Sequence, residues 1–514
     1  MQQRSNQNET AVTNNIAFWY LMVLAGAGTL YVLTCAPTIL WQDSGLFIYR
    51  IYHHDLEGKL GLALAHPLYI MIGFVTKCIP FGELAYKINL LSAIFGAITI
   101  ANMFVLLRLW LDKNLPAIIG AVTLCVSWTF WQYAVIAEVY TLFTAQFLTE
   151  LIVLLLYTKT RKMKFLYLLG LLNGLTIANH MWGVFGLACY TIFVVILLAK
   201  KRISLRCFST IVLLWIIGAL PYEYLIIKNT ILSGDILGTL ASAMFGTQWQ
   251  GAVFNTSVSM KIVLENIIFI FLSFPTPNLL LFFAGLLALK QAETNRSFVN
   301  MTLALVALHL VFAFRYTVPD RYVFLLPFYC LTSFLIGLGA DVIIKRHNRK
   351  MLLYTIIAFA LLPIPVYCIT PDVARKTYKP LGQRRQRPYR DEYTYFLQPW
   401  KTGYRGAERF ADEALASVEK DAIIYAYTTD VHALLYIQEV KGKRNDVKIV
   451  SNYDSSENAP VFDRNTIGQL MRDSSVYVTS PKTGYCPEFL LDDYDFVKAG
   501  VLWRVVKREQ HTPI

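Results

Sequence analysis

The chain carries many long apolar segments, and these constrain its fold more than any other feature. A helix needs about 20 mostly apolar residues to cross the hydrocarbon core of a bilayer. Candidate spanning segments are residues 16–35, 86–107, 115–133, 139–158, 165–179, 181–199, 207–226, 298–314, 322–340 and 351–369. A further stretch, residues 266–289, is uncharged but contains Pro275 and Pro277, so it predicts either one crossing after a re-entrant piece or two short crossings. We therefore predict a mainly α-helical, polytopic membrane protein.

The composition agrees with a membrane location. Hydrophobic residues make up 56% of the chain and charged residues only 16%, with a formal net charge of +13. Soluble domains are typically about 25% charged. A disordered chain, a collagen-like fibre and a cytosolic nucleic-acid binder are excluded, because the positive charge sits in a sequence with too much apolar surface for water. We expect membrane lipids, and no nucleic acid, among its partners.

Clusters of Lys and Arg mark the cytoplasmic ends of membrane helices. Five such clusters fall on one side of the membrane if residues 66–80 do not cross it and residues 266–289 cross it once. This arrangement predicts about eleven transmembrane helices, with a cytoplasmic N-terminus that acts as an uncleaved signal anchor and an extracytoplasmic C-terminus, in a bacterial inner membrane. The clusters are Arg108/Lys113, Lys159/Arg161/Lys162/Lys164, Lys200/Lys201/Arg202/Arg206, Lys290/Arg296 and Lys345/Arg346/Arg349/Lys350.

Two regions are expected outside the membrane: a long first outer loop and a C-terminal domain. In the loop, the apolar stretch Leu68–Ile79 is too short to span comfortably and predicts a juxtamembrane helix at the interface. We place a transmembrane domain at 1–370 and an extracytoplasmic α/β domain at 371–514, with the basic run 379–387 in the linker between them. In the α/β domain, the expected helices are 406–419 and 430–439, and the expected strands are 422–427, 447–451 and 475–480.

Ionisable residues at the outer helix ends are the most informative, because a charge at membrane depth is costly and needs a partner or a function. Asp43, just past the first helix, could act as a general base toward a hydroxyl. Alternatively, Asp43 or Ser44 could simply cap the next helix. His66, followed by Pro67, could face a phosphate together with free backbone amides, or it could be part of an ordinary helix cap.

Residues 128–140 form an aromatic-rich helix end with one carboxylate, Glu138. Aromatic side chains at this depth, such as Trp131 and Tyr140, are usually interfacial anchors. Glu138 has no basic residue nearby in the sequence to pair with, which favours a functional role. Glu150, further along and inside the span, is expected to face the bundle interior as a structural polar contact.

Two further outer turns contribute candidates. Asn179 and His180 lie in a tight turn between two helices. Asn179 could have no role beyond capping this turn, whereas His180 adds a second imidazole on the same membrane face as His66. Arg315 and Arg321 flank an outer hairpin where few positive charges are expected, and Arg is suited to bidentate phosphate binding. An ion pair with Asp320 could neutralise one of them but hardly both.

These segments, in this order, resemble polytopic glycosyltransferases of the GT-C type, in the family that includes the animal protein O-mannosyltransferase acting on plexin-type receptor domains. The similarity covers roughly the first 230 residues and, more weakly, two later stretches. The residues that carry it are Asp43-Ser44-Gly45, His66-Pro67, Ile79-Pro80-Phe81-Gly82, Asn89-Leu90-Leu91-Ser92-Ala93, Trp131 to Tyr140, Gly174 to His180, Leu220-Pro221-Tyr222, Asp320 to Pro327 and Tyr436 to Val447.

The resemblance implies an inverting enzyme that moves a sugar, mannose or a related hexose, from a polyprenyl-phosphate carrier to a protein Ser/Thr hydroxyl on the outer face. Asp43 would be the base, and Glu138 would orient a histidine or bind sugar hydroxyls. We assign Asn179, Tyr140 and Trp131 to substrate binding. The residues around the donor phosphate would be His66, His180, Arg315 and Arg321. No metal ion is expected, and no cofactor besides the lipid-linked sugar.

Three alternatives stay open on sequence alone. The same reaction could act on a glycan or lipid acceptor. The protein could instead transport or flip a lipid-linked or anionic solute, but a transporter needs ionisable residues near the midplane, and here they cluster on the outer side. Finally, the membrane part could be only an anchor for a functional α/β domain, which deletion after Thr370 would test.

Overall fold

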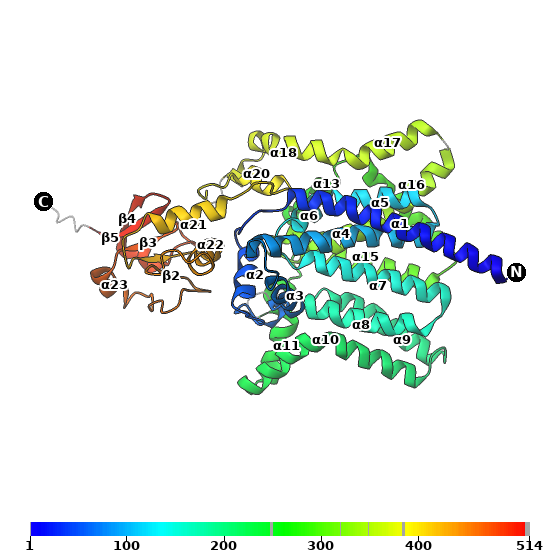
Figure 1. Ribbon diagram of the computed structural model, residues 1–514, viewed down its shortest axis with the longest axis horizontal. Coiled ribbons are helices and arrows are strands. Elements are labelled where there is room, and N and C mark those ends of the chain that lie inside the picture. Colours follow the sequence, from blue (N-terminus) through cyan, green and yellow to red (C-terminus); the bar gives the residue numbers. More distant parts are fainter. Residues whose placement is uncertain (1, 247–249, 319, 348, 383–385, 509–514) are drawn as a thin grey trace.

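The structure is a computed structural model that describes residues 2–246, 250–318, 320–347, 349–382 and 386–508. Figure 1 shows a bundle of long helices with the N-terminus at one end and a small α/β domain at the other. We call the end of the bundle that faces the α/β domain the domain end, and the opposite end the far end. Part of the predicted basic run 379–387, residues 383–385, lies outside the described residues.

Among the described residues, six helices are long and apolar enough to cross a membrane, and three bent helix pairs raise this number to as many as nine. Two further helices of 17 residues, α8 (Met163–Asn179) and the apolar α9 (Gly183–Ala199), belong to the same bundle (Figure 1). The expected number of eleven crossings stays a prediction. The long helices are α1 (Gln2–Thr34), α4 (Leu84–Leu111), α7 (Tyr140–Thr160), α10 (Leu205–Ser233), α15 (Arg296–Arg315), and α16 (Leu326–His347) with the preceding turn η3 (Arg321–Leu325).

Bends divide three of the predicted spans. Proline explains two of the breaks, because it has no N–H to continue a helix: Pro275 and Pro277 lie at one break and Pro363 at another. The predicted domain boundary at residue 370 falls inside the last helix of the third pair. The pairs are α5 (Asn114–Cys125) with α6 (Trp128–Ala134) at 70°, α13 (Met260–Ser273) with η2 (Pro277–Leu280) and α14 (Leu281–Gln291) at 113°, and α17 (Lys350–Leu361) with α18 (Pro363–Thr377) at 47°.

Short helices gather at the domain end of the bundle (Figure 1). The first outer loop forms α2 (Asp43–Tyr52), the turn η1 (Leu62–Leu64) and α3 (Pro67–Lys77). Helix α3 corresponds to the predicted juxtamembrane helix and has 11 residues, which is too short to span. After α10, the chain continues into α11 (Ile236–Phe245) and α12 (Gln250–Val253).

The α/β domain contains a five-stranded mixed sheet in the order β2-β1-β3-β5-β4. Strand β1 pairs parallel with β2 and β3, while β5 is antiparallel to β3 and β4. The three predicted strands form the parallel part; the β4–β5 hairpin, which mixes apolar and charged residues, was not predicted. Element bounds are α19 (Lys379–Gly382), α20 (Glu392–Leu397), α21 (Gly406–Ala416), β1 (Ile423–Tyr425), α22 (Thr428–Leu435), η4 (Tyr436–Val440), β2 (Lys448–Val450), α23 (Ile467–Asp473), β3 (Val476–Val478), α24 (Glu488–Asp493), β4 (Tyr494–Ala499) and β5 (Leu502–Lys507).

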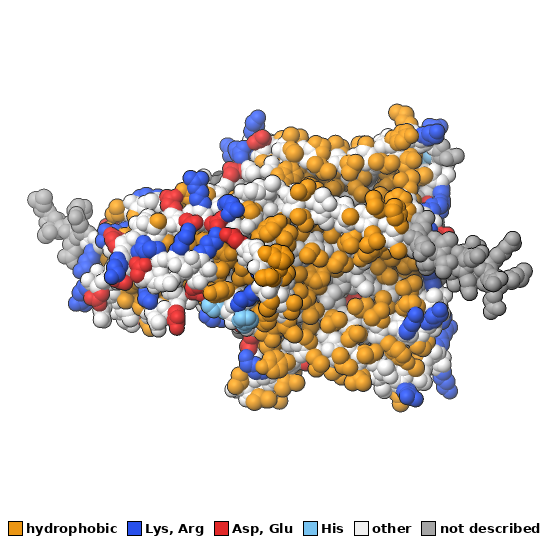
Figure 2. Space-filling view, viewed as in Figure 1, with side chains coloured by type: hydrophobic (Ala, Val, Ile, Leu, Met, Phe, Trp, Pro, Cys, Tyr) orange, Lys and Arg blue, Asp and Glu red, His pale blue; other side chains and the backbone are white. Residues whose placement is uncertain are grey.

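The surface separates into an apolar and a charged part. Figure 2 shows hydrophobic side chains over the sides of the bundle, and Lys, Arg, Asp and Glu over the α/β domain. Large apolar side chains such as Leu213 and Ile227 on α10 are more than half exposed. Such a surface is stable only against lipid, so the bundle is that of a multi-pass membrane protein.

Glycines allow some helices of the bundle to pack closely. Helices α8 and α10 meet where Gly174 faces Gly218. A Cβ on Gly174 would clash with the Trp215 carbonyl, and one on Gly218 would clash with the Leu171 carbonyl. Small residues at such crossings let backbones approach in a membrane, where dispersion contacts between helices replace the hydrophobic effect.

Gly174→Leu is expected to destabilise the protein, because α8 and α10 leave no space for a side chain. Overpacking typically costs about 1–3 kcal/mol, which should appear as a lower unfolding temperature in detergent. Gly26→Leu is the matched control, since a Cβ at Gly26 meets nothing within 4 Å. Equal unfolding temperatures for the two variants would show that this crossing does not limit stability.

Candidate active site

Asp43 begins α2 at the domain end of the bundle. The preceding Gln42 is the N-cap of this helix, has a positive φ of 59°, and donates its N–H to the Thr429 carbonyl over 3.2 Å. Asp43 is therefore not the capping residue. Within the described residues, its carboxylate forms no hydrogen bond or ion pair, and its side chain is accessible to solvent. The carboxylate is thus available to a substrate.

The α/β domain holds α2 in place. Gly45 lies so close to its neighbours that a Cβ there would come within 2.9 Å of the Leu40 carbonyl oxygen and 3.0 Å of the His432 Cβ. At the other end of α2, His53 Nε2 lies 2.6 Å from the Glu439 carboxylate. Helix α2, and with it Asp43, is fixed between the bundle and helix α22 with its π-helical extension η4.

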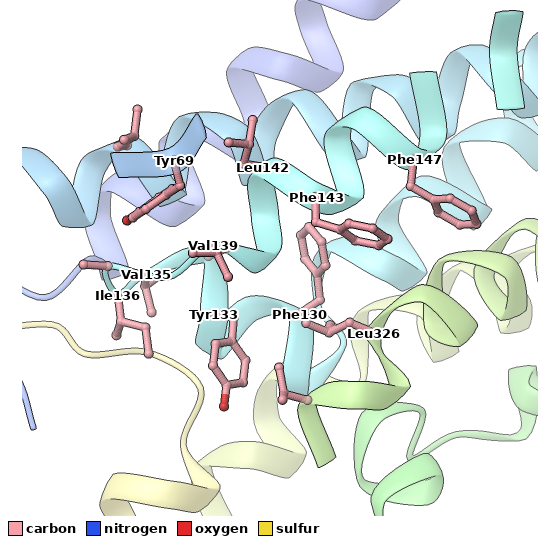
Figure 3. Close-up of a cluster of buried hydrophobic side chains, with 14 of the residues drawn as sticks. Tyr69, Phe130, Tyr133, Val135, Ile136, Val139, Leu142, Phe143, Phe147 and Leu326 are labelled. Carbon is pink, nitrogen blue, oxygen red and sulfur yellow. The ribbon is translucent and has the colours of Figure 1, made fainter. Parts of the chain in front are cut away.

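Glu138 lies in the loop between α6 and α7, which two polar side chains of α4 hold in place. Asn89 Oδ1 accepts from the Ala137 N–H (2.8 Å). Ser92 Oγ accepts from the Glu138 N–H (3.0 Å) and donates to the Glu138 carbonyl (3.1 Å). Glu138 itself is buried, and its Oε2 has no hydrogen-bond partner among the described residues. Figure 3 shows the cluster of buried hydrophobic side chains that includes this loop, with Tyr69, Tyr133, Val135, Ile136 and Val139.

Three carboxyl groups, Asp43, Glu138 and Asp320, lie close enough to interact electrostatically. The Asp43 side chain reaches solvent, but the protein around it removes part of its hydration. This desolvation and, second, the negative charge of Asp320 raise the pKa of Asp43 from 3.8 to about 7. Burial raises the pKa of Glu138 well above its usual range, with further contributions from Asp43 and Asp320, and burial also raises the pKa of Asp320. The raised pKa values favour the protonated carboxyl groups, and Asp43 gains or loses its proton near neutral pH.

Two histidines stack beside each other, with ring centroids 5.0 Å apart. His66 Nδ1 donates to the Asn179 carbonyl (2.7 Å), whereas His180 Nδ1 accepts from the Trp182 N–H (3.1 Å). Burial lowers the pKa of His66 from 6.5 to about 4, and it lowers the pKa of His180 well below 6.5. Both rings are therefore neutral at pH 7, so His180 carries its proton on Nε2, and His66 keeps a lone pair there.

Aromatic rings connect the histidines to the carboxyl groups. Tyr140, at the start of α7, has its ring centroid 5.7 Å from that of His180 and 5.0 Å from that of Tyr133. Tyr133 Oη donates to Tyr322 Oη over 3.3 Å, and Tyr322 follows Asp320 by two residues. The structure thus brings together five of the predicted residues: Asp43, His66, Glu138, Tyr140 and His180.

Two predicted substrate-binding residues are engaged in internal contacts. Asn179 is 1% exposed, and its Nδ2 donates to the Val139 carbonyl (3.2 Å), which joins the end of α8 to the Glu138 loop. Trp131 Nε1 donates to Thr34 Oγ1 (2.9 Å), and its ring packs against Trp400 at 5.4 Å. Their contact with a substrate stays a prediction.

The two predicted arginines also have protein partners. Arg315 donates to the Asn255 and Val253 carbonyls, both at 2.9 Å. Arg321 forms an ion pair with Glu265, while its Nε has no partner among the described residues. The local ion pair with Asp320 that the sequence suggested is absent from the described residues, and Asp320 faces the other carboxyl groups instead. Phosphate binding by the two arginines stays a prediction.

The sequence did not predict the roles of three residues in this arrangement. Asp320 lies beside Asp43, and Asn89 and Ser92 support the Glu138 loop. A signal for the last two was present. They are polar, lie three positions apart on a mostly apolar helix, and so share one helix face. Polar side chains on one face of a membrane helix indicate a polar contact inside the bundle.

Comparison with known proteins supports the resemblance noted in the sequence. Residues 59–205 match the family model described as Protein O-mannosyl-transferase TMEM260 N-terminal domain. Protein O-mannosyl-transferase TMEM260 of Mus musculus is 24% identical over 213 residues, which is 40% of this chain and 30% of that relative. The chain therefore matches less than a third of the relative's length. The resemblance to this family is confirmed for the region that contains His66, Glu138 and His180.

Two crystal structures share the fold over nearly the whole chain. ArnT from Cupriavidus metallidurans bound to undecaprenyl phosphate is 14% identical, with a TM-score of 0.59 over 96% of this chain and 98% of that one. The same protein in the apo state is 13% identical, with a TM-score of 0.56 over 95% and 98%. The predicted GT-C-type fold, with a polytopic helix bundle and a small C-terminal α/β domain, is confirmed.

Asp320→Asn is expected to lower the pKa of Asp43 from about 7, because the substitution removes a neighbouring negative charge. The pKa should stay above 3.8, since desolvation by the surrounding protein is the larger cause of the shift. Infrared titration of the carboxyl C=O band near neutral pH measures this change. Asp473→Asn, which alters an exposed carboxylate of the α/β domain, is the control. An identical titration in both variants would show that Asp320 does not act on Asp43.

Proposed function

We propose that this chain, a GT-C-type membrane protein, is an inverting glycosyltransferase that moves a sugar from a polyprenyl-phosphate carrier to a hydroxyl acceptor. Asp43 carries the proposal. It is a solvent-accessible carboxylate without an ion-pair partner among the described residues, and its pKa is raised to about 7. A general base works best when its pKa lies near the working pH. At the end of a membrane bundle, such a base can meet a hydroxyl while the donor lipid stays in the bilayer.

In the proposed reaction, Asp43 takes the proton of the acceptor hydroxyl as the hydroxyl oxygen attacks the anomeric carbon. The bond from that carbon to the phosphate oxygen breaks on the opposite face, so the configuration inverts and polyprenyl phosphate leaves with the bonding electrons. Burial raises the pKa of Glu138, which favours its protonated form, and the protonated carboxyl group can donate a hydrogen bond to a sugar hydroxyl.

Phosphate is already a good leaving group, so the protein mainly needs to stabilise the negative charge that develops on it. We assign this task to N–H donors. His180 offers its Nε2–H, and Arg321 offers the N–H groups that Glu265 does not use. His66 supports His180 by stacking, since its own N–H is engaged with a backbone carbonyl. Arg315 is the weaker candidate, because backbone carbonyls occupy its guanidinium.

The substrates are proposed from similarity. The match to Protein O-mannosyl-transferase TMEM260 supports mannose or a related hexose as the sugar and a protein Ser/Thr hydroxyl as the acceptor. The fold shared with ArnT, which was crystallised with undecaprenyl phosphate, supports a polyprenyl carrier. The basic clusters at the far end of the bundle support a cytoplasmic far end and an extracytoplasmic site, in a bacterial inner membrane. No metal ion or further cofactor is part of the proposal.

Asp43→Asn is expected to slow transfer by about 10²- to 10⁴-fold, the range typical of a lost general base. Expression should be unchanged, because the Asp43 carboxylate makes no hydrogen bond that folding requires within the described residues. The assay uses the purified protein with polyprenyl-phosphate-mannose and a Ser/Thr-containing peptide. Asp473→Asn is the control for a neutralised surface carboxylate. Retained turnover in Asp43→Asn would exclude Asp43 as the base.

Deletion of the gene in the organism that encodes it is expected to remove a hexose from Ser/Thr residues of secreted or periplasmic proteins. Mass spectrometry of these proteins measures the loss. The wild-type gene should restore the hexose, and the Asp43→Asn gene should not. If no glycoprotein changes, the protein acceptor is wrong, and a glycan acceptor or transport of a lipid-linked solute takes its place.

A further inference from the structure

A groove with a volume of about 250 Å³ lies between α8, α9 and α10. None of the residues that line it is charged. Val212, on its rim, is 41% exposed, so the groove opens toward the surrounding lipid. The lining residues that matter here are Leu166 and Gly170 of α8, Thr191 and Val194 of α9, and Phe208 and Trp215 of α10.

The groove extends inward from the far end of the bundle. On α10, its lining begins at Phe208, close to the start of the helix, and ends at Trp215. At about 1.5 Å per residue, these positions lie roughly 5 and 15 Å from the start of α10, and half the hydrocarbon core is about 15 Å thick. The inner end of the groove therefore lies about one lipid leaflet deep, and its lining along α10 is about 10 Å long.

Trp215, Asn173, Thr176 and Glu150 form a hydrogen-bonded network at the deep end of the groove. Trp215 Nε1 donates to Asn173 Oδ1 (3.1 Å), and Asn173 Nδ2 donates to Glu150 Oε1 (3.3 Å). Thr176 Oγ1 donates to the same Glu150 oxygen at 2.5 Å. Because these side chains are already paired, the groove is suited to a hydrocarbon chain rather than to a polar ligand.

The far-end mouth of the groove is strongly basic. Between Glu150 and Glu223, the chain contains eight Lys and Arg and no Asp or Glu. Figure 2 shows Lys and Arg gathered at this end of the bundle. Within the described residues, the basic side chains of the turn between α9 and α10 and of the first turn of α10 form no ion pair. These side chains are Lys200, Lys201, Arg202 and Arg206.

We propose that this groove binds an anionic phospholipid, with one acyl chain between α8, α9 and α10 and its phosphate held by the four basic side chains. The apolar groove accounts for the chain, and the unpaired positive charges at its mouth account for the selection of an anionic head group. The candidate active site lies at the opposite end of the bundle. The phosphate bound here is therefore not the sugar donor's, and the proposal does not depend on the proposed reaction.

The test identifies the lipid that stays bound to the full-length purified protein. The protein is incubated with equal amounts of phosphatidylglycerol and phosphatidylcholine in mild detergent and analysed by native mass spectrometry. The wild type is expected to retain phosphatidylglycerol preferentially. The combined Lys200→Gln, Lys201→Gln and Arg202→Gln variant should bind it more weakly, by roughly fivefold for each charge removed. The control variant combines Arg346→Gln, Arg349→Gln and Lys350→Gln and removes the same charge from another far-end turn.

Thr191→Trp tests the groove itself, because the indole would occupy the space of the acyl chain and leave the four basic residues unchanged. This variant is expected to lose bound phosphatidylglycerol, while the control variant keeps it. Equal retention of the two phospholipids by the wild type, equal losses in the two charge variants, or unchanged binding in Thr191→Trp would overturn the proposal. A polyprenyl lipid in place of a phospholipid in the wild-type spectrum would also overturn it.

Discussion

The interaction on which the candidate site depends is the repulsion among three carboxyl groups, Asp43, Glu138 and Asp320. Among the described residues, no Lys or Arg forms an ion pair with any of them. Desolvation by the surrounding protein and, second, this repulsion favour the protonated carboxyl group, which moves the pKa of Asp43 to about 7. An ion pair between Arg321 and Asp320 would weaken this effect. The structure pairs Arg321 with Glu265 instead, so the carboxyl groups keep their influence on one another.

The three carboxyl groups come from segments far apart in the chain, and each segment has its own support. The α/β domain fixes α2 through the Thr429 carbonyl and through the close approach of His432 to Gly45. Helix α4 fixes the Glu138 loop through Asn89 and Ser92. The α/β domain is thus part of the framework of the candidate site. This contact argues against the hypothesis that the membrane part is only an anchor for a separate functional module.

Sequence alone could predict the spanning helices and several residues that the fold brings to the candidate site, because both depend on local features. Apolarity over about 20 residues marks a membrane helix, and an ionisable residue at membrane depth is rare enough to single out Asp43, Glu138 and His180. The features that the sequence could not predict are contacts between segments that lie far apart in the chain. Nothing near Asp320 in the sequence shows that it faces Asp43 rather than Arg321. The proton positions on the two histidines depend on backbone groups that only the fold brings to them.

Ring contacts through Tyr140 and Tyr133 connect the histidines to the region that carries the carboxyl groups. A histidinium beside the cluster would stabilise ionised carboxylates and return the pKa of Asp43 toward 3.8, which would make Asp43 a poor base. Burial prevents this by keeping both histidines neutral. A neutral His180 still donates a hydrogen bond through Nε2, so it can bind a phosphate without adding a charge. Inversion also requires the base and the leaving phosphate to lie on opposite faces of the anomeric carbon, and repulsion between the phosphate and the ionised Asp43 favours that separation.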